Sequence, residues 1–238
     1  MALYSLADFV VKLDNQHEFI TRQCMEYRYD GTDPVDFTIR VTEDEISDER
    51  GYFPENHHSL GYLESICAYR KLCVGLPMRN AMVIHGSVIE CDGNGIAFLA
   101  RSGVGKTTHT MLWKQVYGDK VTIINGDKPI IRFFDGVPFA YGTPWSGKEN
   151  LQSNRRVRLT DICLIQRGTE NAVFRIDPAQ QLDAFMQQIL IPTEPAAAER
   201  TLELLDSLLS ECRVWVIQCN ISQEAAIVAY NAIMGDKE

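Results

Sequence analysis

The chain of 238 residues lacks the long apolar run and the leader pattern that mark membrane and secreted proteins. No stretch approaches the ~18 apolar residues that a spanning helix needs. Residues 1–12 have no basic start and are interrupted by Asp8, unlike a secretory signal. We therefore expect a protein of the cytoplasm that does not act at a membrane.

Positive charge and paired cysteines are also scarce. The 23 Lys and Arg against 32 Asp and Glu give a formal net charge of −9, which repels a nucleic-acid backbone. Nucleic acid is therefore not an expected partner. The seven cysteines form no C-x-x-C pair, and several stand in apolar segments, where a thiol packs as a small hydrophobe. We interpret them as reduced core residues.

The composition, 45% hydrophobic and 23% charged, suits one large domain or a domain with a small appendage. Residues 1–78 predict an N-terminal region, rich in β-structure and with helices, that packs on the core. Alternation of apolar and polar residues over 35–41 favours a small antiparallel sheet. The acidic residues 43–50 are typical of a solvated loop or helix face. Apolar residues at helical spacing over 60–69 predict a packing helix that Ser59 caps. The adjacent His57 and His58 lack a third ligand at suitable spacing, so we expect a surface or capping role.

From residue 79 to 238, strands alternate with helices, which predicts an α/β core. The predicted strands cover residues 81–90, 96–99, 121–124, 130–134, 161–166 and 214–219. The predicted helices cover residues 107–117, 178–190, 196–210 and 222–234. The C-terminal helices are expected to pack onto this core.

A glycine-rich loop stands between the apolar strand 96–99 and the helix 107–117. Its residues 100–107 match the P-loop pattern G-x-x-x-x-G-K-[ST], except that Ala100 replaces the first glycine. In this context a chance glycine-rich turn is the weaker interpretation. We expect Mg²⁺ and ATP as cofactors, with Lys106 at the β and γ phosphates and the Thr107 hydroxyl on the metal. The predicted nucleotide-binding residues are Ser102, Gly103, Val104, Gly105, Lys106, Thr107 and Thr108.

A second acidic position follows the apolar residues 121–124, where P-loop enzymes commonly place a carboxylate near Mg²⁺. Asp127 stands there, directly after Gly126. It is a candidate metal ligand, catalytic base, or both in succession. The alternative is an acid that caps a turn.

His85-Gly86-Ser87, the loop 100–107 and Asn125-Gly126-Asp127 together resemble the kinase domain of HPr kinase/phosphorylase. They are more distantly similar to ATP-dependent phosphoenolpyruvate carboxykinase, and closest to short bacterial carboxykinase-like kinases. The resemblance covers about residues 81–168 and implies a P-loop core of that superfamily, with His85 near the transferred phosphoryl group. The family has paired acids where this chain has Gly126-Asp127, so the family base could correspond to either position.

The segment 141–150 resembles a G-T-P-W-x-G-K motif of the carboxykinase-like kinases. By this resemblance Lys148 could clamp phosphate or substrate, and Glu149 could hold Mg²⁺ or accept a proton. A polar turn with a solvated Lys-Glu pair is the alternative. Lys128 and Arg155, the latter from the basic run with Arg156 and Arg158, are weaker candidates for a substrate or phosphate clamp.

The combined pattern predicts an ATP-dependent kinase whose acceptor is a hydroxyl of a small molecule or of a serine in a peptide or protein. A nucleotide-binding regulatory module without transfer, and a bifunctional kinase and phosphorylase, remain alternatives. The chain is too short for a two-lobed phosphoenolpyruvate carboxykinase. The resemblance leaves a homo-oligomer open.

Overall fold

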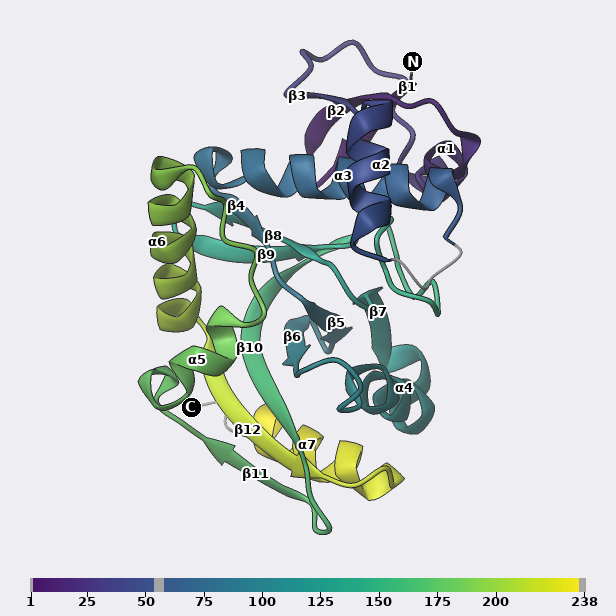
Figure 1. The fold of residues 1–238 in the computed structure, drawn as a ribbon. Coiled ribbons are helices and arrows are strands. Elements are labelled where there is room, and N and C mark those ends of the chain that lie inside the picture. Colours follow the sequence, from purple (N-terminus) through teal and green to yellow (C-terminus); the bar gives the residue numbers. More distant parts are fainter. Residues whose placement is uncertain (1, 54–57, 236–238) are drawn as a thin grey trace.

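The chain folds around a strongly curled mixed sheet with helices on both faces, which confirms the α/β class (Figure 1). The computed structural model describes residues 2–53 and 58–235. Within these residues the nine-stranded sheet runs β4-β8-β9-β10-β6-β5-β7, with β12 beside β10 and β11 beside β12. The strands are β4 (Ala81–Val83), β5 (Gly86–Cys91), β6 (Asn94–Leu99), β7 (Val121–Asn125), β8 (Ile130–Phe134), β9 (Val137–Tyr141), β10 (Arg156–Arg167), β11 (Ala172–Arg175) and β12 (Arg213–Cys219).

The long strand β10 belongs to both parts of the curled sheet. Its residues 156–158 pair antiparallel with β9, whereas later residues run parallel to β6 and β12. The register against β6 shifts between Leu159 and Asp161, and an irregularity of this kind bends a strand. Because β6 and β10 are parallel, their carboxyl ends meet at one edge of the sheet, where the glycine-rich loop begins.

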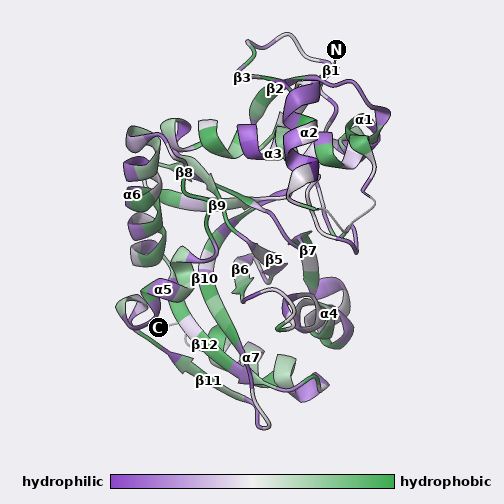
Figure 2. Cartoon of the chain, viewed as in Figure 1, coloured by the Kyte–Doolittle hydropathy of each residue, from purple (hydrophilic) through white to green (hydrophobic). Residues whose placement is uncertain are grey.

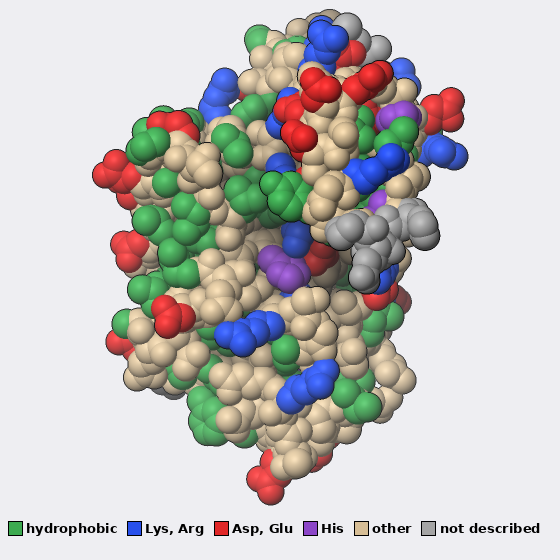
Figure 3. Space-filling model, viewed as in Figure 1, with side chains coloured by type: hydrophobic (Ala, Val, Ile, Leu, Met, Phe, Trp, Pro, Cys, Tyr) green, Lys and Arg blue, Asp and Glu red, His purple; other side chains and the backbone are tan. Residues whose placement is uncertain are grey.

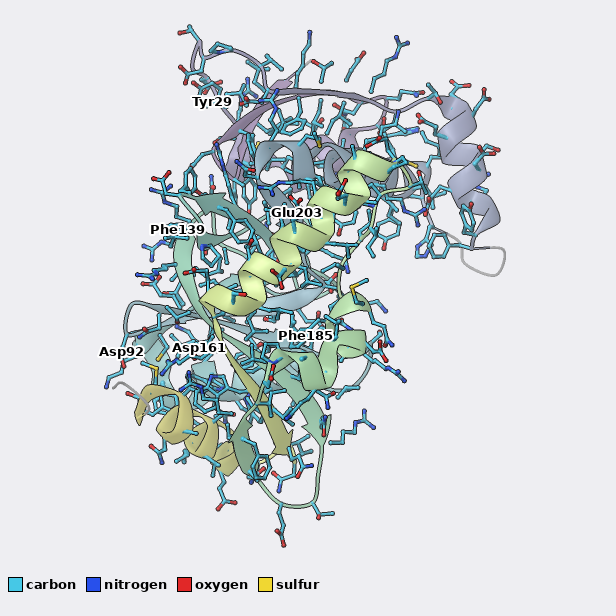
Figure 4. All side chains as sticks on the ribbon, turned by 90° about the vertical axis from the view of Figure 1, so that its left-hand side faces the viewer. Tyr29, Asp92, Phe139, Asp161, Phe185 and Glu203 are labelled. Carbon is cyan, nitrogen blue, oxygen red and sulfur yellow. The ribbon has the colours of Figure 1, made fainter. Side chains whose placement is uncertain are left out.

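Helices cover the two faces of the sheet according to the alternation of its side chains. Phe98 points to the face covered by α4 (Lys106–Tyr117) and α7 (Gln223–Gly235). Its neighbours Ala97 and Leu99 point to the opposite face, covered by α5 (Leu182–Met186) and α6 (Pro195–Glu211). Figure 2 shows the central strands as mainly hydrophobic, and Figure 4 shows α6 with Glu203 exposed on its outer side.

The N-terminal region forms its own three-stranded sheet and helices. Its elements are β1 (Ala2–Leu6), β2 (Phe9–Asp14), α1 (Glu18–Gln23), η1 (Met25–Tyr27), β3 (Phe37–Arg40), α2 (Glu43–Gly51), α3 (Leu60–Gly75) and η2 (Pro77–Arg79). β1 and β2 are antiparallel, but β2 and β3 are parallel. The predicted antiparallel sheet is therefore wrong for β3, because the crossover through α1 and η1 returns the chain in the same direction.

Helices α2 and α3 of this region begin at residues whose side chains cap them. Ser59 accepts a hydrogen bond from the Tyr62 N–H and caps α3, as expected. The acidic stretch forms α2, which starts with a capping box between Thr42 and Glu45. His58 packs between the rings of Phe53 and Tyr62, whereas His57 lies outside the described residues.

The N-terminal sheet is bound to the core through the turn Ala7-Asp8, whose residues both have positive φ. Arg132 donates to the carbonyl of Ala7 at 2.7 Å. The Tyr141 hydroxyl and Arg156 donate to the Asp8 carboxylate at 2.6 and 2.9 Å. One hydrophobic cluster, from Tyr4 through α3 to Trp145, runs across this junction. The N-terminal region therefore shares a core with the sheet.

The predicted strand 81–90 is wrong as a single element, because it is broken at Ile84 and His85. β4 pairs with β8, whereas β5 pairs with β6 and β7, so the two halves lie in different parts of the curled sheet. The His85 N–H donates to the carbonyl of Gln188 at 2.6 Å, and Ile84 pairs with Ile189. The break turns His85 toward the edge of the sheet that carries the loop.

The predicted helix 178–190 is also wrong in extent. The segment forms a 3₁₀ turn, η4 (Pro178–Gln181), and then the short helix α5, which ends at Met186. Beyond it Gln188 and Ile189 pair with the broken strand at His85 and Ile84, which a continuing helix could not do. Strands β9 and β11 were not predicted from the sequence.

No helix among the described residues is long and apolar enough to cross a membrane. All seven cysteines are buried thiols, as the interpretation of core residues expected.

Candidate active site

The glycine-rich loop joins the end of β6 to the start of α4 and exposes backbone N–H groups. Gly103 and Gly105 have φ values of 77° and 129°, a region that side chains other than glycine rarely adopt. Gly105 is the N-cap residue of α4, and no side chain caps the helix there. The first N–H groups of α4 are thus available to an anion, favoured by the positive end of the helix dipole.

Ala100, the departure from the P-loop pattern, is accommodated without strain. It is not among the described residues with positive φ, so this position does not need a glycine. Its methyl group is buried in the core beside α4. Its carbonyl accepts a hydrogen bond from Lys106 Nζ at 2.9 Å, which holds the lysine under the loop.

Asp127 is held in place by a turn built around Asn125. The side-chain oxygen of Asn125 accepts the N–H groups of Asp127 and Lys128 at 2.8 and 2.7 Å. The Asn125 amide donates to the carbonyl of Thr143 at 3.0 Å. These bonds fix the acidic turn against the loop that carries Trp145 and Lys148.

Gly126 is required by close packing. A Cβ at this position would lie 2.9 Å from the carbonyl oxygen of Ser146 and 3.2 Å from the Cβ of Leu151. A carboxylate side chain therefore has no room at Gly126. Asp127 is the acid of this turn.

His85, Asp127 and Lys106 form one contact group. His85 Nε2 lies 3.2 Å from Asp127 Oδ1 and 3.2 Å from Lys106 Nζ. With its amide nitrogen turned toward the surrounding acceptors, Gln188 donates to His85 Nδ1 at 3.3 Å and to the Ala100 carbonyl at 3.1 Å. Because an ionised carboxylate only accepts hydrogen bonds, Nε2 carries the proton of its contact with Asp127 and donates it. His85 therefore orients the carboxylate.

Burial and neighbouring charges shift the pKa values of Asp127 and Lys106. Burial raises the pKa of Asp127, but the hydrogen bond from His85 and the positive charges of Lys128 and Lys106 outweigh it, so the pKa lies below its usual value. Burial lowers the pKa of Lys106, and the charge of Asp127 opposes that shift. Asp127 is thus an ionised carboxylate near neutral pH, suited to a metal ion and weak as a base.

Ten of the predicted site residues line one cavity of about 470 Å³. They are His85, Ser102, Gly103, Gly105, Lys106, Thr107, Thr108, Asp127, Lys148 and Glu149. Figure 3 shows histidine, acidic and basic side chains gathering in a hollow at the middle of one face, below the N-terminal region. The segment with Lys148 and Glu149 thus reaches the loop, although it follows about forty residues later in the chain.

The donor set fits magnesium better than a transition metal. Among the described residues no group of three or more His, Cys, Asp and Glu could hold a metal ion by itself. The cavity instead offers the Thr107 hydroxyl and the carboxylates of Asp127 and Glu149, which both lie within 4 Å of a Cβ built on Gly147. Such hard oxygen ligands, together with substrate phosphates and water, are the usual Mg²⁺ environment.

Three predicted residues lie elsewhere. Val104 lines neighbouring cavities on the far side of the loop. Arg155 is exposed and contributes its backbone to the pairing with Gly142. Lys128 lies 3.6 Å from Asp127 and lines an adjoining cavity.

The sequence analysis did not identify Gln188, Arg167 or a pair of hydrogen-bonded hydroxyl groups behind the loop, those of Thr110 and Ser87. Thr110 on α4 donates to Ser87 at 2.9 Å, and Ser87 donates to the carbonyl of Asn125 at 3.2 Å. This buried relay ties α4 to the Asp127 turn. The spacing of polar residues in apolar segments is the signal that could have identified Ser87 and Thr110, whereas Gln188 carries none.

Arg167 holds the glycine-rich loop from outside, because its guanidinium donates to the carbonyls of Gly103 and Val104. We expect Arg167→Ala to loosen the loop and raise the KM for ATP about threefold to tenfold, with a smaller effect on kcat. Steady-state kinetics against ATP measure both values. Arg158→Ala, an exposed arginine on the same strand, is the matched control. An unchanged KM in Arg167→Ala would mean that the loop needs no clamp.

The lowered pKa of Asp127 predicts that its contribution to the rate does not change with pH near neutrality. A carboxylate with a depressed folded pKa stays ionised above its usual value of about 3.9 and is protonated only as the pH falls through the lower folded value. The ratio of wild-type to Asp127→Asn transfer rates should therefore stay constant from about pH 5.5 to 8.5. A ratio that shrinks as the pH falls from 7 to 5.5 would identify Asp127 as a base with a raised pKa.

Neither a protein-family profile nor a curated protein sequence matches the chain. Among solved structures, the chain is similar to the Hpr(Ser) kinase/phosphatase from Coxiella burnetii, at 10% sequence identity and a TM-score of 0.37. That alignment covers 66% of this chain and 99% of the other. At such a TM-score, function has to be inferred from the site itself.

Proposed function

We propose that the chain is an ATP-dependent kinase that transfers the γ-phosphoryl group of ATP to a hydroxyl of a second substrate. The observation that carries the proposal is one cavity in which a capless helix N-terminus, the buried Lys106 and the ionised Asp127 converge. Backbone donors, a cation and a magnesium ligand are the parts that phosphoryl transfer needs. The motif resemblance to HPr kinase-like proteins points the same way.

The nucleotide base has a natural place beside the phosphate cavity. A second cavity of about 400 Å³ shares Gly103, Gly105 and Thr108 with it. Its walls include the apolar side chains of Leu112, Ile165 and Ile221, against which a flat ring can stack. We assign this cavity to the base and ribose, so that the nucleotide crosses the loop.

Transfer then proceeds by direct displacement. The acceptor oxygen forms a bond to the γ-phosphorus while the bond from that phosphorus to the β–γ bridging oxygen breaks, and ADP leaves. The acceptor proton passes to solvent, because the lowered pKa of Asp127 makes that carboxylate a weak base. Lys106 and the α4 N–H groups stabilise the charge on the phosphate oxygens, and His85 orients Asp127. When bound, Mg²⁺ supplies further neutralisation of phosphate charge.

A nucleotide-binding module without transfer activity is the alternative if the missing first acid marks lost chemistry. Because Gly126 is dictated by packing against Ser146, its lack of a carboxylate is not a sign of lost chemistry. The proposal retains a location in the cytoplasm and leaves phosphorylase activity and a homo-oligomer open.

Transfer from γ-labelled ATP tests the proposal. Purified protein with Mg²⁺ is incubated with a pool of cell metabolites below 1 kDa and, separately, with a pool of small proteins. Label in either pool, absent when Lys106→Ala replaces the wild type, supports a kinase. Tight ATP binding with no label in either pool would contradict phosphoryl transfer and favour a nucleotide-binding module without transfer activity.

A further inference from the structure

A third cavity, of about 450 Å³, adjoins the phosphate cavity and is formed jointly by the N-terminal region and the core. Helix α3 contributes one wall with Tyr62, Ile66, Tyr69 and Arg70, and α1 contributes Gln23. The segment 145–148 and the Asp127 turn form the opposite wall. Its size is that of small-molecule sites in general.

The two cavities meet at the reacting end of the proposed nucleotide. Asp127, Gly147 and Lys148 line both. A group held in the third cavity can thus present an oxygen next to Asp127, on the side of the phosphate loop. The cavity assigned to the base shares none of these three residues.

The floor of the third cavity is held together by side-chain hydrogen bonds and a ring contact. Ser65 donates to the side chain of Gln23 at 2.5 Å and accepts from Trp145 Nε1 at 3.0 Å. The Gln23 amide donates to the carbonyl of Pro144 at 3.0 Å, and the rings of Tyr69 and Trp145 lie 5.4 Å apart. These polar atoms satisfy each other, so the floor offers an ordered, largely aromatic surface.

The rim carries excess positive charge. Arg70, Lys128 and Lys148 line the cavity, and Asp127 is the acidic residue among its described lining. Arg70 also pairs with the buried Glu49 at 3.0 Å, while 47% of the Arg70 side chain stays exposed. Lys148 is exposed and makes no ion pair with a described residue. After Asp127 and Glu49 are counted, one positive charge remains for a ligand.

We infer that this cavity is the acceptor site, and that the acceptor joins the reacting hydroxyl to a carboxylate and an apolar body. The carboxylate pairs with Lys148 and Arg70, the apolar body lies against Tyr69 and Trp145, and the hydroxyl faces Asp127. The inference rests on the proposed kinase activity. It gives the N-terminal region a function: α1 and α3 complete the substrate site.

A label-transfer experiment can test the acceptor site separately from the kinase activity. The metabolite pool is divided by anion exchange into retained and unretained fractions, and the small-protein pool is kept as a separate arm. Wild-type protein should label a compound in the retained fraction, or a small protein if the carboxylate belongs to a polypeptide. At limiting acceptor, Lys148→Gln and Arg70→Gln should each lower transfer about tenfold to hundredfold, through a raised acceptor KM.

Arg79→Gln is the matched control, because Arg79 has a similar exposure and ion pair, with Asp36 at 3.1 Å, but does not line the cavity. Lys148→Gln also guards against misfolding, since Lys148 is solvent-exposed. Label on an unretained compound, or wild-type acceptor KM values in both variants, would overturn the acceptor site alone. No label from the wild type in any pool would instead overturn the kinase activity on which it rests.

Discussion

Replacing Lys106 by alanine should lower phosphoryl transfer by ~10²-fold to 10³-fold while the protein stays folded. Lys106 is 8% exposed, and its ammonium group faces the cavity between the carbonyl of Ala100 and the ring of His85. Burial already lowers its pKa, so the charge costs stability in the absence of a phosphate. Its removal should therefore harm catalysis and leave the core intact.

The measurement is the initial rate of label transfer, with thermal unfolding followed in parallel. Lys120→Ala provides the control, because this exposed lysine lies beyond the end of α4. Transfer by Lys106→Ala at the wild-type rate would eliminate the phosphate-loop mechanism. A large fall in the unfolding temperature would show that the lysine is structural.

Replacing Asp127 by asparagine should cost at least as much, ~10²-fold to 10³-fold in kcat. The amide keeps the size of the side chain but loses the charge that a metal ion and the neighbouring cations require. That negative charge is contacted by His85 and Lys128, and the positive charge of Lys106 also stabilises it. The KM for ATP should change far less than kcat, since the loop N–H groups and Lys106 remain.

Glu149→Gln separates the two carboxylates of the cavity. Glu149 is exposed at its rim, whereas Asp127 is half-buried and fixed by Asn125. We expect the Glu149 variant to retain more activity than Asp127→Asn at saturating Mg²⁺ and to need more Mg²⁺ for half-maximal rate. The reverse order in a Mg²⁺ titration would transfer the central metal role to Glu149.

The strands and the helix that carry the site motifs could be predicted from the sequence because each motif is short and continuous. Gly105-Lys106-Thr107 requires only a strand before it and a helix after it, and both form as predicted. Asp127 likewise follows directly on an apolar strand. Periodicity within one segment was sufficient in these cases.

The parts that failed depend on contacts between distant segments. The break at His85 is stabilised by Gln188, about a hundred residues later, and the same pairing shortens the helix before Gln188. Residue patterns report which segments are apolar, but not which sheet part each joins. The cavity between α3 and the segment 145–148 was missed for the same reason, since Arg70 and Lys148 line one cavity only after α3 packs on the core.

Isothermal titration with ATP in the presence of Mg²⁺ tests the central claim most directly. Wild-type protein should bind one ATP, more tightly than AMP, and Lys106→Ala should bind it at least about tenfold more weakly, as expected for a lost charge-assisted contact to phosphate. Failure of the wild type to bind ATP, or equal affinity in the two proteins, would contradict the assignment of this cavity to the phosphates of a nucleotide.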